Sequence, residues 1–368
     1  MSKNSKDIVF VAAQRSAIGR YKGIYKDLQA HNLGSLVIKS LIEKTKLKVD
    51  EIDEVILGQV LTGSCGQNPA RQAAINSGIP KEKTAIIINQ VCGSGLRSIV
   101  NGYQSILTSS ANFIIAGGQE SMTNSIHDQM MKDGLTDAFY NYHMGVTAEN
   151  VAAKYNISRQ EQDEFALESQ QKANIAINKK KFDDEIINDD IDEHPRNGIT
   201  INDLSKLNSV FKEKGTVTPG NSSGINDGAA AVVLTKRELA EKHNLEILGK
   251  IISWATCGVD PSMMGLGPIP SSNKALEIAK WNVKDLDLIE INEAFAAQSI
   301  AVIKELKVPK EKVNVNGGAI ALGHPIGASG ARIVVTLLNE LKKISGKKGL
   351  ATLCIGGGMG ISMCIEKD

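Results

Sequence analysis

The feature that most constrains the fold is an internal repeat between the two ends of the chain. Three pairs of segments share the same pattern of turns, apolar runs and glycines, in the same order and with similar gaps. They are VDEIDEVILG (49–58) with VKDLDLIEIN (283–292), CGSGLRSIVNGYQSIL (92–107) with IGASGARIVVTLLNEL (326–341), and NFIIAGGQES (112–121) with LATLCIGGGMG (350–360). Any two α/β segments can share one such pattern, but three in order predict a duplicated unit.

Strand-like and helix-like patterns alternate along the first repeat. They are DIVFVAA (7–13), NLGSLVIKSLIEKT (32–45), DEVILGQV (53–60), TAIIINQV (84–91), a helical run from Leu96 to Ile106, and NFIIAGG (112–118). This alternation predicts α/β layers around largely parallel sheets. TAIIINQV in particular is expected to be a buried strand.

The repeat also predicts how the chain is divided. One half covers residues 1–118 and resumes at 222–244, where GINDGAAAVVLT reads as a late strand. The second half covers 245–368. Residues 119–221 are rich in Asp, Asn, Lys and Gln and are expected to form an inserted loop domain that includes a long amphipathic helix over 160–182.

Composition excludes several classes of protein. A net charge of +1 gives no overall attraction for nucleic acid or for an anionic membrane surface, and no apolar run reaches the length of a membrane span. The first apolar run holds only six residues, too few for the core of a signal peptide. Five cysteines without a CxxC pair argue against a disulfide framework or a structural zinc site. We expect a cytoplasmic protein without a metal ion.

Cys92 lies between an apolar strand pattern and a glycine-rich helix start. At a helix N-terminus a thiolate would face unpaired N–H groups and the positive end of the helix dipole, which can lower the pKa of the thiol. Gly93 and Gly95 would allow other backbone or a ligand to approach closely. The alternative is a buried cysteine that only fills space.

A nucleophilic cysteine needs a base, and His324 stands out among the six histidines. It lies between glycine-rich turns in NGGAIALGHPIGASGAR (316–332), nearly the place that Cys92 occupies in the first repeat. A pseudo-symmetric pair of halves would bring the two helix starts together. His31, His194 and His243 lie in polar contexts and are expected at the surface.

Two further segments place polar groups at strand ends, where α/β sheets hold ligands. Cys354 ends an apolar run and is followed by three glycines, whose bare N–H groups could bind an oxyanion; the alternative is a core cysteine. Asn292 and Glu293 follow the apolar run LDLIEI.

Six blocks together resemble the signature segments of the thiolase family, in family order. They are NQVCGSGLRS, YHMGVTAENVA, GNSSGINDGAA, INEAFAAQS, NGGAIALGHPIGASGAR and CIGGGMG, and the resemblance runs from about Ile8 to Ile365. It implies an α/β fold of two duplicated βαβαβαββ halves in a five-layered α-β-α-β-α sandwich with an inserted loop domain. Within the family the blocks look most like acetyl-CoA acetyltransferases, which condense two acetyl-CoA to acetoacetyl-CoA and CoA without a cofactor.

The resemblance implies a role for each reactive residue. Cys92 would carry the acyl group, His324 would activate it, and Cys354 would exchange the α-proton of the second acetyl-CoA. His324 and a water held by Asn292 would form one oxyanion hole, and the backbone N–H groups of Cys92 and Gly356 the other. A thiolate–imidazolium pair would lower the pKa of Cys92 further.

The resemblance also implies substrate-binding positions. Ser223 would lie along the pantetheine arm of CoA, His143, Met144, Met264 and Phe295 would line the acyl pocket, and Arg196 and Phe211 would lie near the adenine end. For Met144 and Met264 simple filling of the core is an equally good interpretation. The HM pair is typical of the short-chain type.

Two loops are shorter than the family pattern. About sixteen residues are missing between GGQESM and KDGLTDAF, and about eleven between FDDEI and RNGIT. The first loop contributes to tetramer contacts in related enzymes, so a homodimer is expected here. The acidic replacement DDEIINDDIDE also puts strong binding of the CoA phosphates in doubt.

Three other functions fit the pattern less well. A degradative 3-ketoacyl-CoA thiolase of broader chain length is the nearest, although the HM pair argues against it. A weakly active partner subunit would not need the reactive residues. A decarboxylating condensing enzyme typically has histidine where this chain has Cys354. No role is predicted for Cys65, Cys257 or Cys364.

Overall fold

The computed structural model describes residues 4–188 and 190–368. Its strands are β1 (Ile8–Arg15), β2 (Gly19–Arg20), β3 (Glu54–Gly58), β4 (Thr84–Ile88), β5 (Ile114–Ser121), β6 (Asn226–Lys236), β7 (Gly249–Gly258), β8 (Leu288–Ile291), β9 (Lys348–Ile355) and β10 (Met359–Glu366). They follow the order β4-β3-β5-β6-β1-β7-β10-β9-β8, with β2 paired to β6. Only a short pairing of Val9 and Phe10 with Lys250 and Gly249 joins β1 to β7. The strands therefore form two sheets that meet at their β1 and β7 edges.

The two sheets repeat one topology, which confirms the duplication predicted from the sequence. The order β3-β5-β6-β1 in the first sheet corresponds to β8-β9-β10-β7 in the second. In both, the first pair is parallel and the other two pairs are antiparallel. Even β4 has a counterpart, because Val313 makes an isolated parallel bridge to Ile289 of β8.

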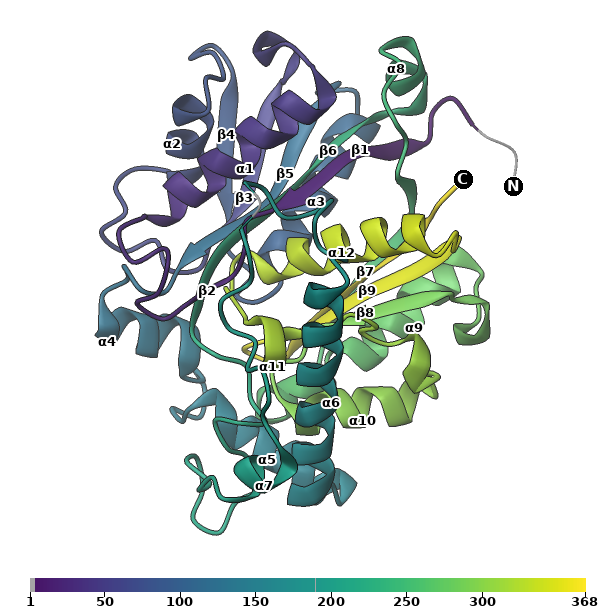
Figure 1. Ribbon diagram of the computed structural model, residues 1–368. Helices are drawn as coiled ribbons and strands as arrows, with labels where there is room; N and C mark the ends of the chain where they lie inside the picture. Colours follow the sequence, from purple (N-terminus) through teal and green to yellow (C-terminus); the bar gives the residue numbers. More distant parts are fainter. Residues whose placement is uncertain (1–3, 189) are drawn as a thin grey trace.

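The helices lie on both faces of each sheet (Figure 1). They are α1 (Ala30–Thr45), α2 (Pro69–Asn76), α3 (Ser94–Leu107), α4 (His127–Gln129), α5 (Met144–Tyr155), α6 (Arg159–Asn178), α7 (Ile201–Ser205), α8 (Arg237–Lys242), α9 (Pro268–Ala279), α10 (Ala296–Leu306), α11 (Ala319–Leu322) and α12 (Ser329–Lys343). Short 3₁₀ turns cover Val49–Glu51, Pro261–Leu266, Val283–Asp285 and Lys310–Lys312, and a π-helical turn covers Met130–Leu135. No helix in the described part of the chain is long and apolar enough to cross a membrane.

Three apolar cores fill the spaces between five layers, and one of them extends over both faces of the middle layer. One core joins α1 and α2 to the first sheet, and another joins α9 and α10 to the second. The third contains α3 and α12 together with strands of both sheets, so these two helices form the central layer. The sandwich α-β-α-β-α expected from the sequence is confirmed, and the central helices are the two that follow Cys92 and His324.

The strand β4 differs from its prediction. It pairs only with β3 and lies at the edge of the first sheet, so it is half-exposed rather than buried, with Ile86 43% exposed. An apolar run of this length fits a strand covered on both faces, but here the sheet ends at β4. Whether such a run becomes a central strand or an exposed edge strand depends on the segments that pack beside it, which the run itself does not show.

The inserted region differs slightly at its borders. The predicted boundary at 118 falls inside β5, which continues to Ser121 because Gln119, Glu120 and Ser121 pair with β6. The helix expected over 160–182 is α6 and ends at Asn178. The insert includes α4 to α7. In Figure 1 α5, α7 and the lower part of α6 lie below the sheets, whereas α4 lies to their left.

A buried ion-pair cluster ties the insert to the first sheet. Arg15 at the end of β1 is fully buried and donates hydrogen bonds to Glu185 at 2.7 Å and to both carboxylate oxygens of Asp192 at 2.7 and 2.9 Å. Removing one partner would leave an uncompensated buried charge, so this cluster fixes the insert in one position.

Candidate active site

Cys92 lies in a strand–turn–helix junction. β4 ends at Ile88, Val91 adopts a left-handed conformation with φ of 47°, and α3 begins two residues after Cys92, at Ser94. A positive φ is strained for a β-branched residue such as Val91. The Ser94 hydroxyl holds this turn, since it accepts from the Gln90 N–H at 2.9 Å and donates to the Val91 carbonyl at 2.6 Å. The half-buried thiol is thereby fixed at the helix start, as predicted.

Two glycines bring the starts of α3 and α12 into direct contact. A Cβ atom on Gly95 would lie 2.7 Å from the backbone nitrogen of Ala331, and a Cβ on Gly330 would clash with the backbone nitrogen of Leu96. Only glycine allows the two backbones to approach this closely. The predicted meeting of the two helix starts is therefore found, and with it Cys92 and His324 line one cavity.

Hydrogen bonds define the protonation of the His324 ring. Ser329 Oγ donates to the Pro325 carbonyl at 2.9 Å and lies 2.6 Å from His324 Nδ1. A serine hydroxyl has a single proton, so Ser329 accepts at its second contact and Nδ1 carries the imidazole proton. Nε2 is buried without a hydrogen-bond partner among the described residues. The free lone pair of His324 is therefore on Nε2, where a base needs it.

The resting electrostatics differ from the prediction for this pair. Burial raises the pKa of Cys92 to about 11, opposed by the backbone N–H of Gly356. Burial, together with the cation of Arg332, lowers the pKa of His324 to about 3. The expected thiolate–imidazolium pair is therefore wrong for the unliganded site, because desolvation outweighs the helix start. A neutral thiol and a neutral imidazole line the cavity.

Cys354 lies at the end of β9, close enough for the charge of Cys92 to act on it. Burial, and then the Cys92 thiolate, raise the pKa of the fully buried Cys354 thiol well above its usual range. The next residue but one, Gly356, directs its N–H at the Cys92 sulfur. The second half thus contributes a thiol and a backbone donor to the same place.

Asn292 and Glu293 follow β8 and point to different surroundings. Asn292 is fully buried, with Nδ2 3.5 Å from His324 Nδ1 and with an unpartnered Oδ1. Glu293 accepts hydrogen bonds from Ser169 at 2.7 Å and Asn314 at 2.8 Å. Asn292 therefore belongs to the reactive cluster, whereas Glu293 holds α6 of the insert against the second half.

A cavity of about 300 Å³ is lined by two of the reactive residues, Cys92 and His324, and by every predicted binding residue. Its lining includes Cys92, His324, Gly356, Ser223, His143, Met144, Arg196, Phe211, Met264 and Phe295. Cys354 packs against the same wall, in a cluster with Met144, Met264 and Phe295. This volume is at the lower end of small-molecule sites. Met144 and Met264 can be interpreted either as pocket lining or as core filling, and they do both, since they line the cavity and pack in the core behind it.

Comparison with known families supports what this geometry indicates. The thiolase N-terminal domain matches residues 8–129 and 124–238, and the thiolase C-terminal domain matches 245–367. The chain belongs to the thiolase family. Its similarity to individual thiolases extends over the whole length of both proteins.

Two curated relatives and two solved structures illustrate this. Acetyl-CoA acetyltransferase of Rhizobium meliloti (strain 1021) is 52% identical over 391 residues, covering 99% of this chain and all of the relative. Cytosolic acetyl-CoA acetyltransferase of Rattus norvegicus is 46% identical over 396 residues, covering all of both chains. These aligned lengths exceed the 368 residues of this thiolase, as expected for shortened loops.

Both structures share the fold closely. The Bacillus anthracis acetyl-CoA acetyltransferase has a TM-score of 0.96 and 40% identity, covering 99% of this chain and 100% of that one. Human mitochondrial 3-ketoacyl-CoA thiolase in complex with CoA has a TM-score of 0.95 and 41% identity, covering 99% and 98%.

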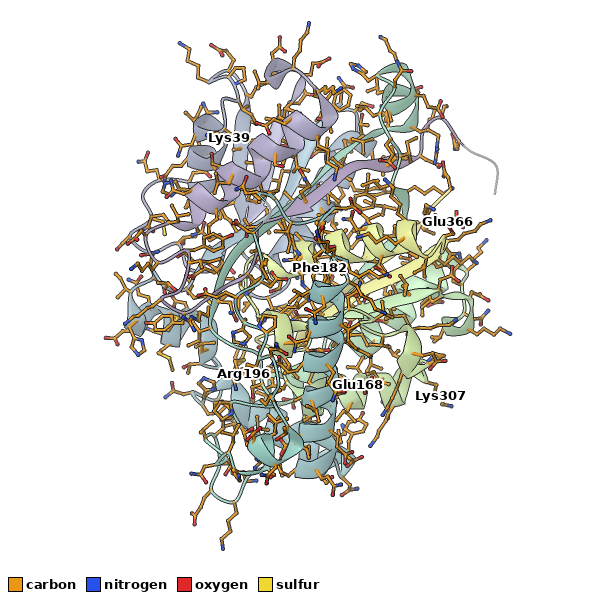
Figure 2. All side chains as sticks on the ribbon, viewed as in Figure 1. Lys39, Glu168, Phe182, Arg196, Lys307 and Glu366 are labelled. Carbon is orange, nitrogen blue, oxygen red and sulfur yellow. The ribbon has the colours of Figure 1, made fainter. Side chains whose placement is uncertain are left out.

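Two of the predicted binding residues in this thiolase are held by backbone contacts. Ser223 donates both its N–H, at 3.0 Å, and its hydroxyl, at 3.1 Å, to the Ala294 carbonyl. The Arg196 N–H donates to Gln170 Oε1 at 2.8 Å, so Arg196 lies beside α6 (Figure 2). Its guanidinium forms no ion pair with the described residues, and so remains available for an anion.

Phe211 packs against two of the other predicted binding residues. Its ring stacks on His143 with centroids 4.5 Å apart and meets Phe295 edge-on at 6.4 Å. It therefore lies with the residues expected beside the acyl group. The absence of a side chain at Gly145 allows this position, since a Cβ there would clash with the Phe211 ring.

Three residues of the site were missed from the sequence. His194 was expected at the surface but lines the cavity; its place two residues before Arg196 was the available signal. Ser329 was noted only as part of the repeat. Glu120 is fully buried and accepts from the N–H groups of Val60 at 3.0 Å, Leu61 at 3.2 Å and Gly327 at 2.9 Å. It thereby ties the loop after His324 to the first half.

Proposed function

We propose that this thiolase is an acetyl-CoA C-acetyltransferase, which reversibly condenses two acetyl-CoA to acetoacetyl-CoA and CoA through an acetyl-Cys92 intermediate. The observation that carries the proposal is that Cys92 and His324 line one cavity, with Cys354 packed behind its wall and close enough for the charge of Cys92 to act on it. Relatives named acetyl-CoA acetyltransferase, alignable over the whole chain, support it.

The first half-reaction is transfer of the acetyl group to Cys92. As the sulfur attacks the thioester carbonyl, His324 Nε2 takes the thiol proton, and the tetrahedral oxyanion accepts hydrogen bonds from the N–H groups of Cys92 and Gly356. Collapse breaks the bond to the CoA sulfur, which takes the proton of the Cys354 thiol and leaves as CoA-SH, so that Cys354 is left as a thiolate and His324 keeps the Cys92 proton on Nε2. The unpartnered Nε2 of His324 supports this role of His324 as proton acceptor.

The second half-reaction forms the carbon–carbon bond. The Cys354 thiolate takes an α-proton from a second acetyl-CoA, and the enolate oxygen accepts hydrogen bonds from the protonated Nε2 of His324 and from a water held by Asn292. The enolate carbon attacks the acetyl carbon on Cys92 and expels the Cys92 sulfur, which takes back its proton from His324 Nε2. The acetyl thioester on Cys92 is uncharged, so no charge on Cys92 opposes the Cys354 thiolate while it acts as the base.

The lining of the cavity supports a short acyl group. Met144, Met264 and Phe295 pack together around Cys354 and leave little room beyond the reacting carbon. Ser223 lies along the pantetheine arm, and Arg196 faces the phosphates as the free cation of the lining. The reaction needs no cofactor, because the thioester and the side chains supply all its chemistry.

The test is acetyl-CoA labelling followed by peptide mass mapping. The wild type should gain one acetyl group, on the peptide that contains Cys92, and Cys92→Ser should lose it. His324→Ala should slow labelling by about 10²- to 10⁴-fold, the range of general acid–base catalysis. Cys354→Ala should still become labelled but fail to condense. A wild type that takes no label would instead support a non-catalytic partner subunit.

A degradative 3-ketoacyl-CoA thiolase is the second candidate. A structure of that name, bound to CoA, matches this chain at 41% identity. Thiolysis rates across 3-ketoacyl-CoA chain lengths separate the two, and activity undiminished on long chains would exclude the short-chain assignment.

The protein is further proposed to form a homodimer in the cytoplasm. The exposed edge strand β4 supports association, because TAIII presents unpaired backbone and apolar side chains without a charge that would block pairing. Light scattering after size exclusion should give the mass of two chains, and Ile86→Lys should reduce it to one. A mass of four chains would exclude a dimer. Five free cysteines and a relative named cytosolic support a cytoplasmic location.

A further inference from the structure

His194 occupies a position in the cavity to which no role has been given. It lies two residues before Arg196, on the segment beside α6 that Figure 2 marks with Arg196. Its ring lies against the backbone at Gly224, where a Cβ atom would be 2.8 Å from His194 Nε2. The same Cβ would be 3.0 Å from Asn226 Oδ1, which accepts the His324 N–H at 2.9 Å. The imidazole therefore lies between Arg196 and the loop that carries the reactive histidine.

Several other neutral polar atoms on this wall are already engaged within the protein. Ser222 donates its hydroxyl to the Thr218 carbonyl at 2.8 Å, and Ser223 donates to the Ala294 carbonyl at 3.1 Å. His143 uses Nδ1 to accept from the Gly145 N–H at 3.0 Å. The ring nitrogens of His194, in contrast, form no hydrogen bond with the described residues. A half-buried polar group without a partner suits a ligand that supplies one.

The chemistry of His194 matches a neutral ligand group. Burial and the neighbouring Arg196 cation lower its pKa to about 4, while Asp192 and Glu193 oppose this shift. At neutral pH the ring is therefore uncharged and offers one donor and one acceptor. An amide offers the complementary acceptor and donor, whereas a phosphate would prefer the guanidinium of Arg196.

We propose that His194 is a specificity-determining residue that hydrogen-bonds an amide or hydroxyl of the pantetheine arm, between the reacting thioester and the phosphates at Arg196. This inference rests on the proposed function. It gives the two residues separate tasks, since His194 recognises the arm and Arg196 recognises the nucleotide end. CoA and free pantetheine both contain the pantetheine arm, but only CoA has the nucleotide end.

Calorimetric titration with CoA and with pantetheine tests this separation. His194→Ala should weaken both ligands by the same factor, about five- to tenfold for a lost hydrogen bond. Arg196→Ala should weaken CoA and leave pantetheine unchanged. His127→Ala, which removes an exposed histidine of α4, is the matched control and should change neither. His194→Gln keeps a donor and an acceptor and should recover part of the affinity, whereas His194→Phe should not.

Steady-state kinetics give a second readout. With His194→Ala, KM should rise for acetyl-CoA and acetyl-pantetheine while kcat stays within about twofold, since the lost contact is made equally in ground and transition states. The acetyl thioester of N-acetylcysteamine lacks most of the arm and should be unaffected. Unchanged affinity for both ligands, a loss confined to CoA, or an equal fall in kcat on all three thioesters would overturn the proposal. Titration needs no turnover, so failure of acetyl transfer would reject only the proposed function.

Discussion

At the scale of single residues, the site depends on which atoms carry protons. Ser329 fixes the His324 tautomer because its single proton is committed to Pro325, which leaves Nε2 as the only free base of the ring. Ser94 performs the corresponding task before α3, where it holds the turn that carries Cys92. The serine of the repeated Ser-Gly pair thus holds the reactive group of each half in place, Cys92 in the first half and His324 in the second.

Removal of the Ser329 hydroxyl should therefore impair the base without removing it. We expect Ser329→Ala to lower the rate of Cys92 acetylation by about tenfold, because a share of the His324 rings would take the wrong tautomer or rotate. Rapid-quench mass spectrometry measures this rate. Ser98→Ala is the matched control, since that buried hydroxyl of α3 contacts only the Ser94 carbonyl. Equal losses in both variants would show a packing effect instead.

The neutral Cys92–His324 pair makes a prediction about pH. With the pKa of Cys92 raised to about 11, its thiolate fraction grows tenfold for each pH unit below that value. The rate of Cys92 alkylation by iodoacetamide, followed by peptide mass mapping, should thus keep rising from pH 7 to 10. A plateau near neutral pH would indicate a thiolate–imidazolium pair and contradict the resting state described above.

At the scale of elements, the contact between α3 and α12 decides whether the reactive groups meet. Each helix contributes a glycine at the crossing, and neither position has room for a methyl group. The two helices also belong to the single central core that both sheets share. Their separation therefore sets the distance between the Cys92 and His324 loops.

A methyl group at this crossing should separate the helices. We expect Gly330→Ala to cost about 1–3 kcal/mol in the free energy of unfolding, as overpacking typically does, and to reduce acetylation of Cys92 more than hundredfold. Denaturant unfolding and labelling measure the two effects. At Gly258 an added methyl group would lie 3.9 Å from its nearest neighbouring atom, so Gly258→Ala should leave both nearly unchanged. Full activity in Gly330→Ala would refute the role of the crossing.

At the scale of the whole molecule, buried carboxylates join the two halves. Glu120 connects β5 to the loop after β3 and to the loop after His324 through three backbone N–H groups. Burial raises its pKa from an ordinary 4.5 to about 7. The folded protein therefore binds this proton more tightly than the unfolded chain does.

This raised pKa decides whether the free energy of unfolding rises or falls with pH. The contribution of Glu120 is fully present below about pH 4.5 and is lost as the pH rises through about 7. Between pH 5 and 8 the free energy of unfolding should fall more steeply in the wild type than in Glu120→Gln. Urea unfolding at several pH values measures the difference in slope, with Glu213→Gln on the surface as control. Parallel slopes in wild type and Glu120→Gln would contradict the assignment.

The sequence by itself determined the duplicated α/β halves, and it singled out Cys92, His324, Cys354 and Asn292 as candidates for the reaction. The halves depend on local signals, because apolar periodicity, glycine runs and the repeated Ser-Gly pair can be recognised without knowing which segments meet. The role of each candidate residue came instead from the resemblance to thiolases. Tertiary structure alone decided the edge position of β4, the neutral state of Cys92 and His324, and the place of His194 in the cavity. Each of these depends on neighbours distant in the chain, because burial changes both exposure and the free energy of a charge.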